Sequence, residues 1–162
     1  MMELVLYHGT DHLFQEIDLG KSVGRRDFGI GFYTTTIAAQ AESWARSKKV
    51  RNCSAMAYVY VYQAKIPDDM SVCRYGGLTI EWLEMVRKNR KIGGIQHGYD
   101  IVIGPVADDD TMVTVNRYVQ GIYTVDEALK RLCFSRANDQ VSFHTERAVR
   151  CLHLLRRYQV GE

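Results

Sequence analysis

The sequence has no excess of charge, no long apolar run and no closely paired cysteines, and each absence excludes a class of protein. Its 21 Lys and Arg residues stand against 19 Asp and Glu residues, a formal net charge of +2. Non-specific nucleic-acid binding requires many phosphates to be neutralised at once, so the overall charge gives no argument for it, although a local basic patch stays open. No apolar run approaches the roughly 20 residues that cross a bilayer, so we expect no membrane contact.

The cysteines lie far apart, and none belongs to a C-x-x-C pair. The first six residues include Glu3 and lack the basic and apolar regions of a secretory signal. Both observations are typical of a protein with free thiols in a reducing compartment, and we expect a cytoplasmic location. The cysteines are Cys53, Cys73, Cys133 and Cys151.

The composition predicts one folded domain over residues 1–162. Hydrophobic residues make up 46% of the chain and charged residues 25%, which is enough apolar material for a core. Single domains mostly hold about 100–150 residues, and neither repeats nor linker-like segments divide this chain.

Predicted strands and helices alternate irregularly, and the strands are short. Apolar and β-branched runs predict strands at 3–7, 30–35, 55–66, 100–106 (broken at Gly104 and Pro105) and 140–144. Helical spacing of apolar residues and capping patterns predict helices at 37–50 (with Thr36 as N-cap), 79–90, 124–133 and 145–157. This order favours a mixed α+β fold over a doubly wound parallel sheet.

Several familiar motifs are missing. Gly29 and Gly31 begin a dinucleotide-binding G-x-G, but the third glycine and the later acidic residue are absent. The histidines form neither H-E-x-x-H nor a spacing matched to cysteine pairs, so no metal is expected. The G-x-S-x-G elbow of serine hydrolases is absent as well, whereas a Cys–His pair from distant parts of the chain stays open.

Three segments stand out against this background. Y-H-G-T at 7–10 follows the first predicted strand, D-F-G-I-G-F-Y-T-T at 27–35 leads into a helix, and N-D-Q at 138–140 starts a late strand. His8 alone would be an ordinary hydrogen-bonded residue at a strand end, and Tyr33 alone an ordinary core residue. To dismiss a functional site, both of these ordinary explanations would have to hold independently. A nucleotide site formed by these motifs is therefore the favoured interpretation.

These segments resemble the ADP-ribosyltransferase superfamily, in particular the His–Tyr–Glu branch shared by poly(ADP-ribose) polymerases and diphtheria toxin. Y-H-G-T matches the first motif of that branch, and F-G-I-G-F-Y-T matches its second motif, F-G-x-G-I-Y-F. Together with Y-D-I-V-I-G-P-V-A-D-D at 99–109, the set is similar to one bacterial family of short ADP-ribosyltransferase-like proteins. The resemblance implies an α+β fold with a split pair of small β-sheets, flanking helices and NAD in the cleft between the sheets.

The resemblance also implies a role for the matching residues. His8 would hydrogen-bond the adenosine ribose, the Gly9 backbone would hold the nicotinamide carboxamide, and Tyr33 would stack on the nicotinamide ring. Thr34 and Thr35 would add hydroxyl contacts near the nicotinamide ribose. The remaining NAD-binding candidates are Thr10, Phe28 and Gly31 from the matched motifs, and Arg25 and Arg26, whose charge and position suit the pyrophosphate.

Gln140 stands where the superfamily has a glutamate that holds the ribose 2′-hydroxyl and helps to activate the acceptor. A glutamine can orient a ribose but takes up no proton at neutral pH. Nicotinamide leaves NAD⁺ as a neutral molecule through an oxocarbenium-like state, so its departure needs no general acid. Asp139 and Glu146 are nearby candidates for activating the acceptor.

We therefore expect mono-ADP-ribosyl transfer from NAD⁺ to an unidentified protein or nucleic acid, with Tyr33 and Gln140 as catalytic residues. Small bacterial proteins of this type resemble toxins or defence effectors, which implies an antitoxin-type partner. The alternative, favoured by Gln140, is a non-catalytic module that binds NAD or ADP-ribose. A third possibility keeps the fold as a protein-interaction scaffold.

Overall fold

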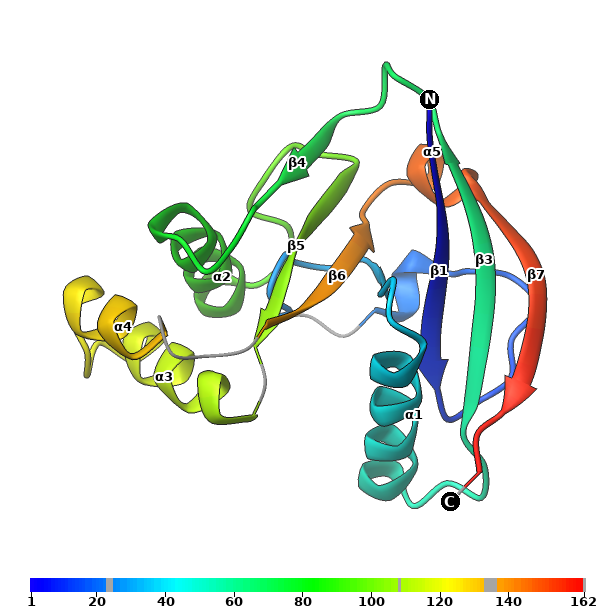
Figure 1. Ribbon diagram of the computed structural model, residues 1–162, viewed down its shortest axis with the longest axis horizontal. Coiled ribbons are helices and arrows are strands. Elements are labelled where there is room, and N and C mark those ends of the chain that lie inside the picture. The colour runs from blue at the N-terminus through cyan, green and yellow to red at the C-terminus, as the bar shows by residue number, and fades with distance from the viewer. Residues whose placement is uncertain (23–24, 108, 133–136, 162) are drawn as a thin grey trace.

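The computed structural model describes residues 1–22, 25–107, 109–132 and 137–161, and over these residues seven strands form two small sheets (Figure 1). The first sheet is antiparallel, with β1 (Met2–Thr10), β3 (Tyr58–Ile66) and β7 (Leu152–Gln159) in the order β1-β3-β7. The second sheet has the order β2-β6-β5-β4, and only its β4–β5 pair is parallel. Its strands are β2 (Phe32–Thr34), β6 (Ala137–Phe143), β5 (Ile101–Ala107) and β4 (Val72–Arg74).

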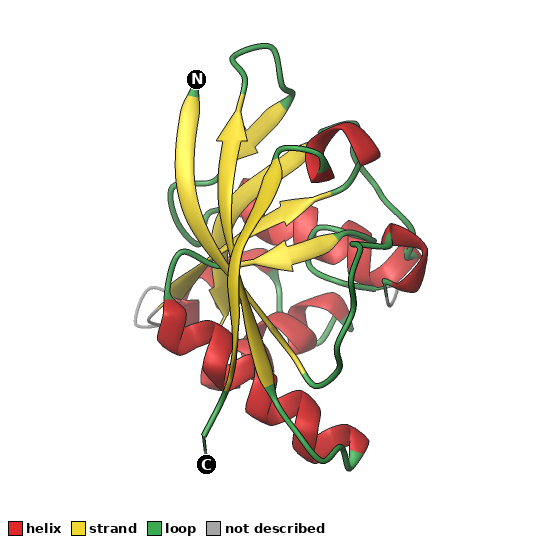
Figure 2. Ribbon diagram, turned by 90° about the vertical axis from the view of Figure 1, so that its right-hand side faces the viewer, coloured by secondary structure: helices red, strands yellow, loops and turns green. Residues whose placement is uncertain are grey.

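The helices divide between the two sheets. Helix α1 (Ala38–Asn52) lies along β1, whereas α2 (Ile80–Ile92), α3 (Asp109–Val119) and α4 (Val125–Leu132) gather beside the second sheet (Figures 1 and 2). The short α5 (Glu146–Val149) connects β6 to β7, and one 3₁₀ turn spans Leu19–Lys21.

One apolar core joins the two sheets. Leu6 and Tyr60 from the first sheet pack with Ile101 and Phe143 from the second, and each of these four side chains is at most 1% exposed. The backbones meet as well, because the Tyr7 amide donates to the Thr35 carbonyl at 2.8 Å and the Thr35 amide returns a bond at 3.0 Å. The predicted mixed α+β fold with a split pair of small sheets is therefore confirmed.

Two predicted helices agree closely with the structure: α2 begins one residue after its predicted start, with Thr79 as its N-cap, and α4 has the predicted capping contact at Thr124. The Thr79 hydroxyl accepts a bond from the Trp82 amide at the start of α2. The Thr124 hydroxyl accepts one from the Glu127 amide before α4, and residue 133 lies outside the described residues. Helix α1 was also predicted, but its N-cap is Ile37 rather than Thr36.

The predicted helix over 145–157 is wrong beyond its first turn. Only Glu146–Val149 is helical, and Leu152–Gln159 instead forms the edge strand β7, paired with β3. Hydrogen bonding to an existing sheet outweighs the helical spacing of Leu152 and Leu155, since local preference is weak against tertiary pairing.

The predicted break at Gly104 and Pro105 is wrong too. Strand β5 runs through both residues, with Pro105 opposite Asp139 of β6. Pro105 has no amide hydrogen, but β4 ends opposite Ile103, so no strand on that side requires one.

No helix in the described part of the chain is long and apolar enough to span a membrane. Cys53, Cys73 and Cys151 are free thiols, while Cys133 is outside the described residues.

Candidate functional site

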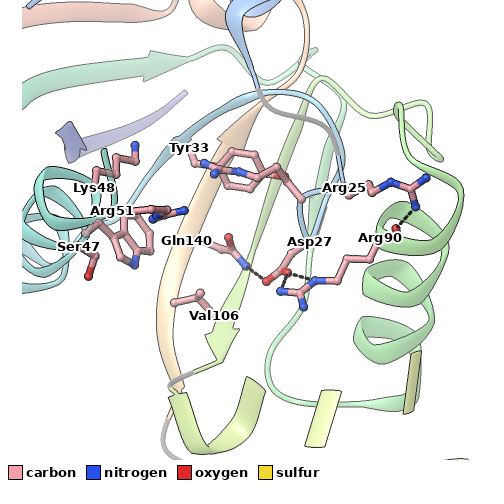
Figure 3. Close-up of a pocket in the computed structure, with 11 residues that line it drawn as sticks. Arg25, Asp27, Tyr33, Ser47, Lys48, Arg51, Arg90, Val106 and Gln140 are labelled. Carbon is pink, nitrogen blue, oxygen red and sulfur yellow. Dashed lines mark hydrogen bonds and ion pairs between the residues drawn. The ribbon is translucent and has the colours of Figure 1, made fainter. Parts of the chain in front are cut away.

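Two neighbouring cavities lie between α1, the end of β1 and the loop before β2. They measure about 220 Å³ and about 300 Å³ and share Arg26, Tyr33, Lys48 and Arg51 in their walls. We call the smaller one the Gln140 cavity, after the β6 residue in its wall, and the larger one the His8 cavity, after the β1 residue in its wall. Figure 3 shows the Gln140 cavity with side chains from α1, α2, β6 and the 25–27 loop around it.

Tyr33 forms part of the wall between the cavities and is locked in place. Its hydroxyl donates to the Gly29 carbonyl at 2.6 Å and accepts from the Phe28 amide at 3.0 Å. Burial raises the pKa of this phenol, so it stays neutral at physiological pH. The Arg26 guanidinium lies over the ring, 4.7 Å from its centroid. The ring face thus already holds a cation.

Gln140 belongs to a buried polar network. Its Nε2 donates to Asp27 Oδ2 and to the Pro105 carbonyl, each at 3.1 Å. The other oxygen of Asp27 accepts from Arg90, whose Nε lies at 2.7 Å and whose Nη2 also contacts it (Figure 3). The network therefore places an ion pair from the 25–27 loop and α2 directly behind the glutamine.

His8 lies inside β1, two residues before the strand ends. Its Nδ1 donates to the Tyr33 carbonyl at 2.7 Å, because a carbonyl oxygen can only accept. The ring stacks on Phe32 with centroids 4.1 Å apart. Burial, helped by the nearby Lys48 charge, lowers the pKa of His8 to about 3. Its Nε2 therefore carries a free lone pair, which suits a ribose hydroxyl.

Gly9 lets the α1 backbone approach β1 closely. A Cβ atom at this position would lie 2.0 Å from the Ala41 carbonyl oxygen. In a strand, the amide and carbonyl groups of residues two apart point to the same edge. The amide and carbonyl of Tyr7, two residues before Gly9, bond Thr35 rather than β3. The Gly9 amide and carbonyl therefore face the cleft side of β1, where the carbonyl accepts from Lys48 Nζ at 2.9 Å.

Cations gather where the two cavities meet. Lys48 and Arg51 lie three residues apart on α1 and face the cavities together with Arg26. Burial, followed by the charge of Arg26, lowers the pKa of Lys48 to about 8. Such a group of cations is suited to an anionic ligand.

The family model described as "Protein of unknown function (DUF3990)" matches residues 4–154, which include all of these side chains. The chain belongs to the DUF3990 family. The search of curated proteins found no match, and neither did the search of solved structures.

In this DUF3990 domain, several of the predicted site residues come together. His8, Thr10, Arg26, Gly31 and Tyr33 line the His8 cavity. Arg25, Arg26, Tyr33 and Gln140 line the Gln140 cavity, although the Arg25 guanidinium turns away and donates to the Arg90 and Lys91 carbonyls at 3.0 and 2.9 Å (Figure 3).

Other predicted residues support the DUF3990 cleft from behind. Phe28 is fully buried in the core beneath α2. The Thr34 hydroxyl donates to the Val141 carbonyl and the Thr35 hydroxyl to Asp139 Oδ1, both at 2.7 Å, which ties β2 to β6. Asp139, expected as an acceptor-activating group, is thereby engaged at the start of α1, where it also accepts from the Thr36 amide. Glu146, the other such group, begins α5.

Sequence reasoning missed the contributions of the DUF3990 helices. Trp44, Ser47, Lys48 and Arg51 follow the three- and four-residue spacing of one helix face, a pattern that was available in the sequence. No comparable sequence pattern indicated that Arg90 would lie in the cavity wall or contact Asp27. Among the described residues, no group of three or more His, Cys, Asp or Glu side chains is placed to hold a metal ion.

Proposed function

We propose that this protein is an ADP-ribosyltransferase of the His–Tyr–Glu type that binds NAD⁺ across the two joined cavities. The observation that carries the proposal is the cation group at their junction, formed by Arg26, Lys48 and Arg51. NAD⁺ consists of two nucleosides joined by a pyrophosphate, and guanidinium and ammonium groups suit that pyrophosphate. The nicotinamide riboside would occupy the Gln140 cavity and the adenosine the His8 cavity.

The contacts around Tyr33 support a cationic ring at this place. The Arg26 guanidinium over the phenol ring indicates that the face accepts positive charge, and the nicotinamide ring of NAD⁺ is itself cationic. Binding would move Arg26 from the ring toward the pyrophosphate. The cleft-facing Gly9 amide would hold the carboxamide.

The chemistry is a substitution at C1′ of the nicotinamide ribose. The C1′–N bond breaks and its electron pair leaves with nicotinamide, which becomes neutral, while C1′ develops oxocarbenium character. A lone pair of the acceptor then forms the new bond to C1′, and the acceptor proton passes to water. The acceptor would be a macromolecule, in keeping with a toxin or defence effector that an antitoxin-type protein silences.

A second candidate function is a module that binds NAD or ADP-ribose without turnover. It is favoured by Gln140, because the amide cannot take a proton from an acceptor. The two candidates share one binding site and differ only in whether the C1′–N bond breaks.

Adenine-labelled NAD⁺ incubated with the protein and a bacterial lysate separates them. Release of nicotinamide with label on a macromolecule supports the transferase, and binding without release supports the module. If the protein neither binds NAD⁺ nor releases nicotinamide, both candidate functions are contradicted and a protein-interaction scaffold is favoured.

Tyr33→Leu tests the site within that experiment, because leucine keeps an apolar side chain at this buried position but offers no π face. We expect NAD⁺ affinity to fall roughly tenfold, as measured by calorimetry on protein shown to be folded. Tyr123→Leu is the matched control: an Arg131 guanidinium lies 4.3 Å from the Tyr123 ring centroid, but Tyr123 belongs to the α3–α4 connection. Unchanged affinity in the Tyr33 variant would remove this residue from the site.

A further inference from the structure

The buried carboxylate of Asp27 lies against the amide of Gln140, although 113 positions separate them in the chain. Both side chains are nearly inaccessible, with 6% of Asp27 and 3% of Gln140 exposed. Arg90 keeps Asp27 in ion-paired form, and its third nitrogen donates to Asn116 Oδ1 at 2.8 Å. Asp27 is therefore a fixed negative charge in the wall of the Gln140 cavity.

The partners of Gln140 decide which way its amide points. A glutamine side chain has two N–H donors on one atom and one acceptor oxygen on the other. Asp27 Oδ2 and the Pro105 carbonyl, each 3.1 Å from Nε2, can only accept. A flipped amide would turn its oxygen against both acceptors, so both donors are used here. The acceptor oxygen Oε1 is left for the cavity.

We infer that Asp27 is the positioning residue that makes Gln140 present a hydrogen-bond acceptor to the nicotinamide ribose. The inference rests on the proposed NAD⁺ site and concerns how its ribose is held. In this arrangement Gln140 lies between the ribose and the negative charge of Asp27, so the ribose meets the uncharged amide oxygen of Gln140 rather than a carboxylate. A ribose hydroxyl that donates to the Gln140 oxygen is held in one orientation. The lone pairs of the hydroxyl oxygen then stabilise the positive charge that develops at C1′.

Single substitutions should disturb this arrangement in opposite ways. Gln140→Glu would bring a second carboxylate against Asp27 Oδ2 and the Pro105 carbonyl, with no donor between them. Asp27→Asn would offer an N–H to the Gln140 amide once its oxygen is used by Arg90, which favours the flipped amide.

Combining the two substitutions should restore the hydrogen bond between positions 27 and 140, so that the Pro105 carbonyl is the one acceptor that still faces the new carboxylate without a donor between them. The new amide at position 27 donates to the new carboxylate at position 140, and one carboxylate oxygen again faces the cavity. The number of charges around Arg90 is unchanged. The Pro105 carbonyl keeps a donor, because Trp82 Nε1 lies 3.0 Å from it.

The experiment measures nicotinamide release from NAD⁺ with water as the acceptor, for the wild type, Asp27→Asn, Gln140→Glu and the double variant. We expect each single substitution to lower kcat roughly tenfold or more with KM changed less than about threefold, and the double variant to exceed both singles at least about fivefold. Asp100→Asn is the control for losing a half-buried, hydrogen-bonded aspartate, since the Asp100 side chain is 16% exposed. The Asp100 carboxylate accepts from the Thr145 hydroxyl at 2.6 Å, beyond the C-terminal end of β6 and outside the walls of both cavities, so the kcat of this variant should stay near that of the wild type.

The outcomes separate the inference from the proposed function. A wild-type rate in Asp27→Asn, or a double variant no better than the poorer single, overturns the inference and leaves the transferase standing. The inference is also overturned if the loss of kcat in each variant is explained by a matching decrease in its melting temperature. If the wild type binds NAD⁺ without releasing nicotinamide, we expect the NAD⁺ affinities of the wild type and its variants to follow the order predicted for their rates. If it neither binds nor turns over NAD⁺, the proposed function and the inference fail together.

Discussion

At the scale of single residues, burial sets the charge that each group brings to the cleft. His8, with a pKa lowered to about 3, is a neutral hydrogen-bonding group at any physiological pH. Lys48, with a pKa lowered to about 8, is a cation that loses its proton in a mildly alkaline range. The two side chains line the same cavity, so their different roles come from their environment and not from their position alone.

Lys48 makes NAD⁺ binding depend on pH in a defined direction. Protonated Lys48 attracts the pyrophosphate, and above its pKa of about 8 most of that charge is lost. We expect NAD⁺ affinity, measured by calorimetry, to fall roughly fivefold between about pH 7 and pH 9. Lys48→Arg should give a flat profile, because a guanidinium stays charged. Identical profiles for wild type and variant would mean that Lys48 does not hold the phosphates.

The candidate site could be predicted from the sequence where its residues belong to short motifs or, as with Arg25 and Arg26, lie directly beside one. His8, Tyr33 and Gln140 were found because the segments that carry them follow one another in a known order. The contact between Asp27 and Gln140 could not be found, since it depends on how the loop before β2 folds against β6. Thr34 and Thr35 carried no sign that their hydroxyls would be used by β6.

At the scale of elements, the packing of α1 against β1 depends on the missing side chain of Gly9. We expect Gly9→Ala to lower the free energy of unfolding by about 3 kcal/mol, because its Cβ would overlap the α1 backbone, which cannot move alone. Chemical denaturation measures the change. Gly77→Ala is the control, since an added Cβ there meets nothing within 4 Å. Equal stability of the two variants would contradict the close approach.

The elements themselves were predicted unevenly, and the difference lies in what stabilises each one. Helices α2 and α4 have their own N-caps, so local sequence is enough to place them. Strand β7 has no such local determinant. Its residues become a strand because β3 offers a free edge, which only the assembled sheet reveals. For the same reason the three-residue β4 was not foreseen.

At the scale of the whole molecule, the half-buried His8 and the buried His144 connect segments that lie far apart in the chain. His8 joins β1 to β2 through the Tyr33 carbonyl. His144, directly after β6, contacts the Ile30 carbonyl through Nδ1 at 2.8 Å and Ser142 through Nε2 at 2.7 Å. Both imidazoles must be neutral or nearly so in the folded protein, and this requirement ties the stability of the whole fold to pH.

The free energy of unfolding should therefore decrease as the pH falls below about 6.5. Burial lowers the pKa of His144 from 6.5 to about 4 in the folded protein. Between these values the unfolded chain binds a proton that the folded chain does not, so acid favours unfolding, by about 3 kcal/mol for this histidine.

Denaturation series from about pH 7 to pH 4 for the wild type and His144→Gln test this linkage. The variant has no proton to gain at this position, so it should lose about 3 kcal/mol less over the same interval, even if it starts from a lower stability. His153→Gln, at an exposed position of β7, should keep the wild-type slope. If His144→Gln kept that slope too, the acid sensitivity would have to arise from His8 and the carboxylates, since removing the His144 imidazole would then leave proton uptake on unfolding unchanged.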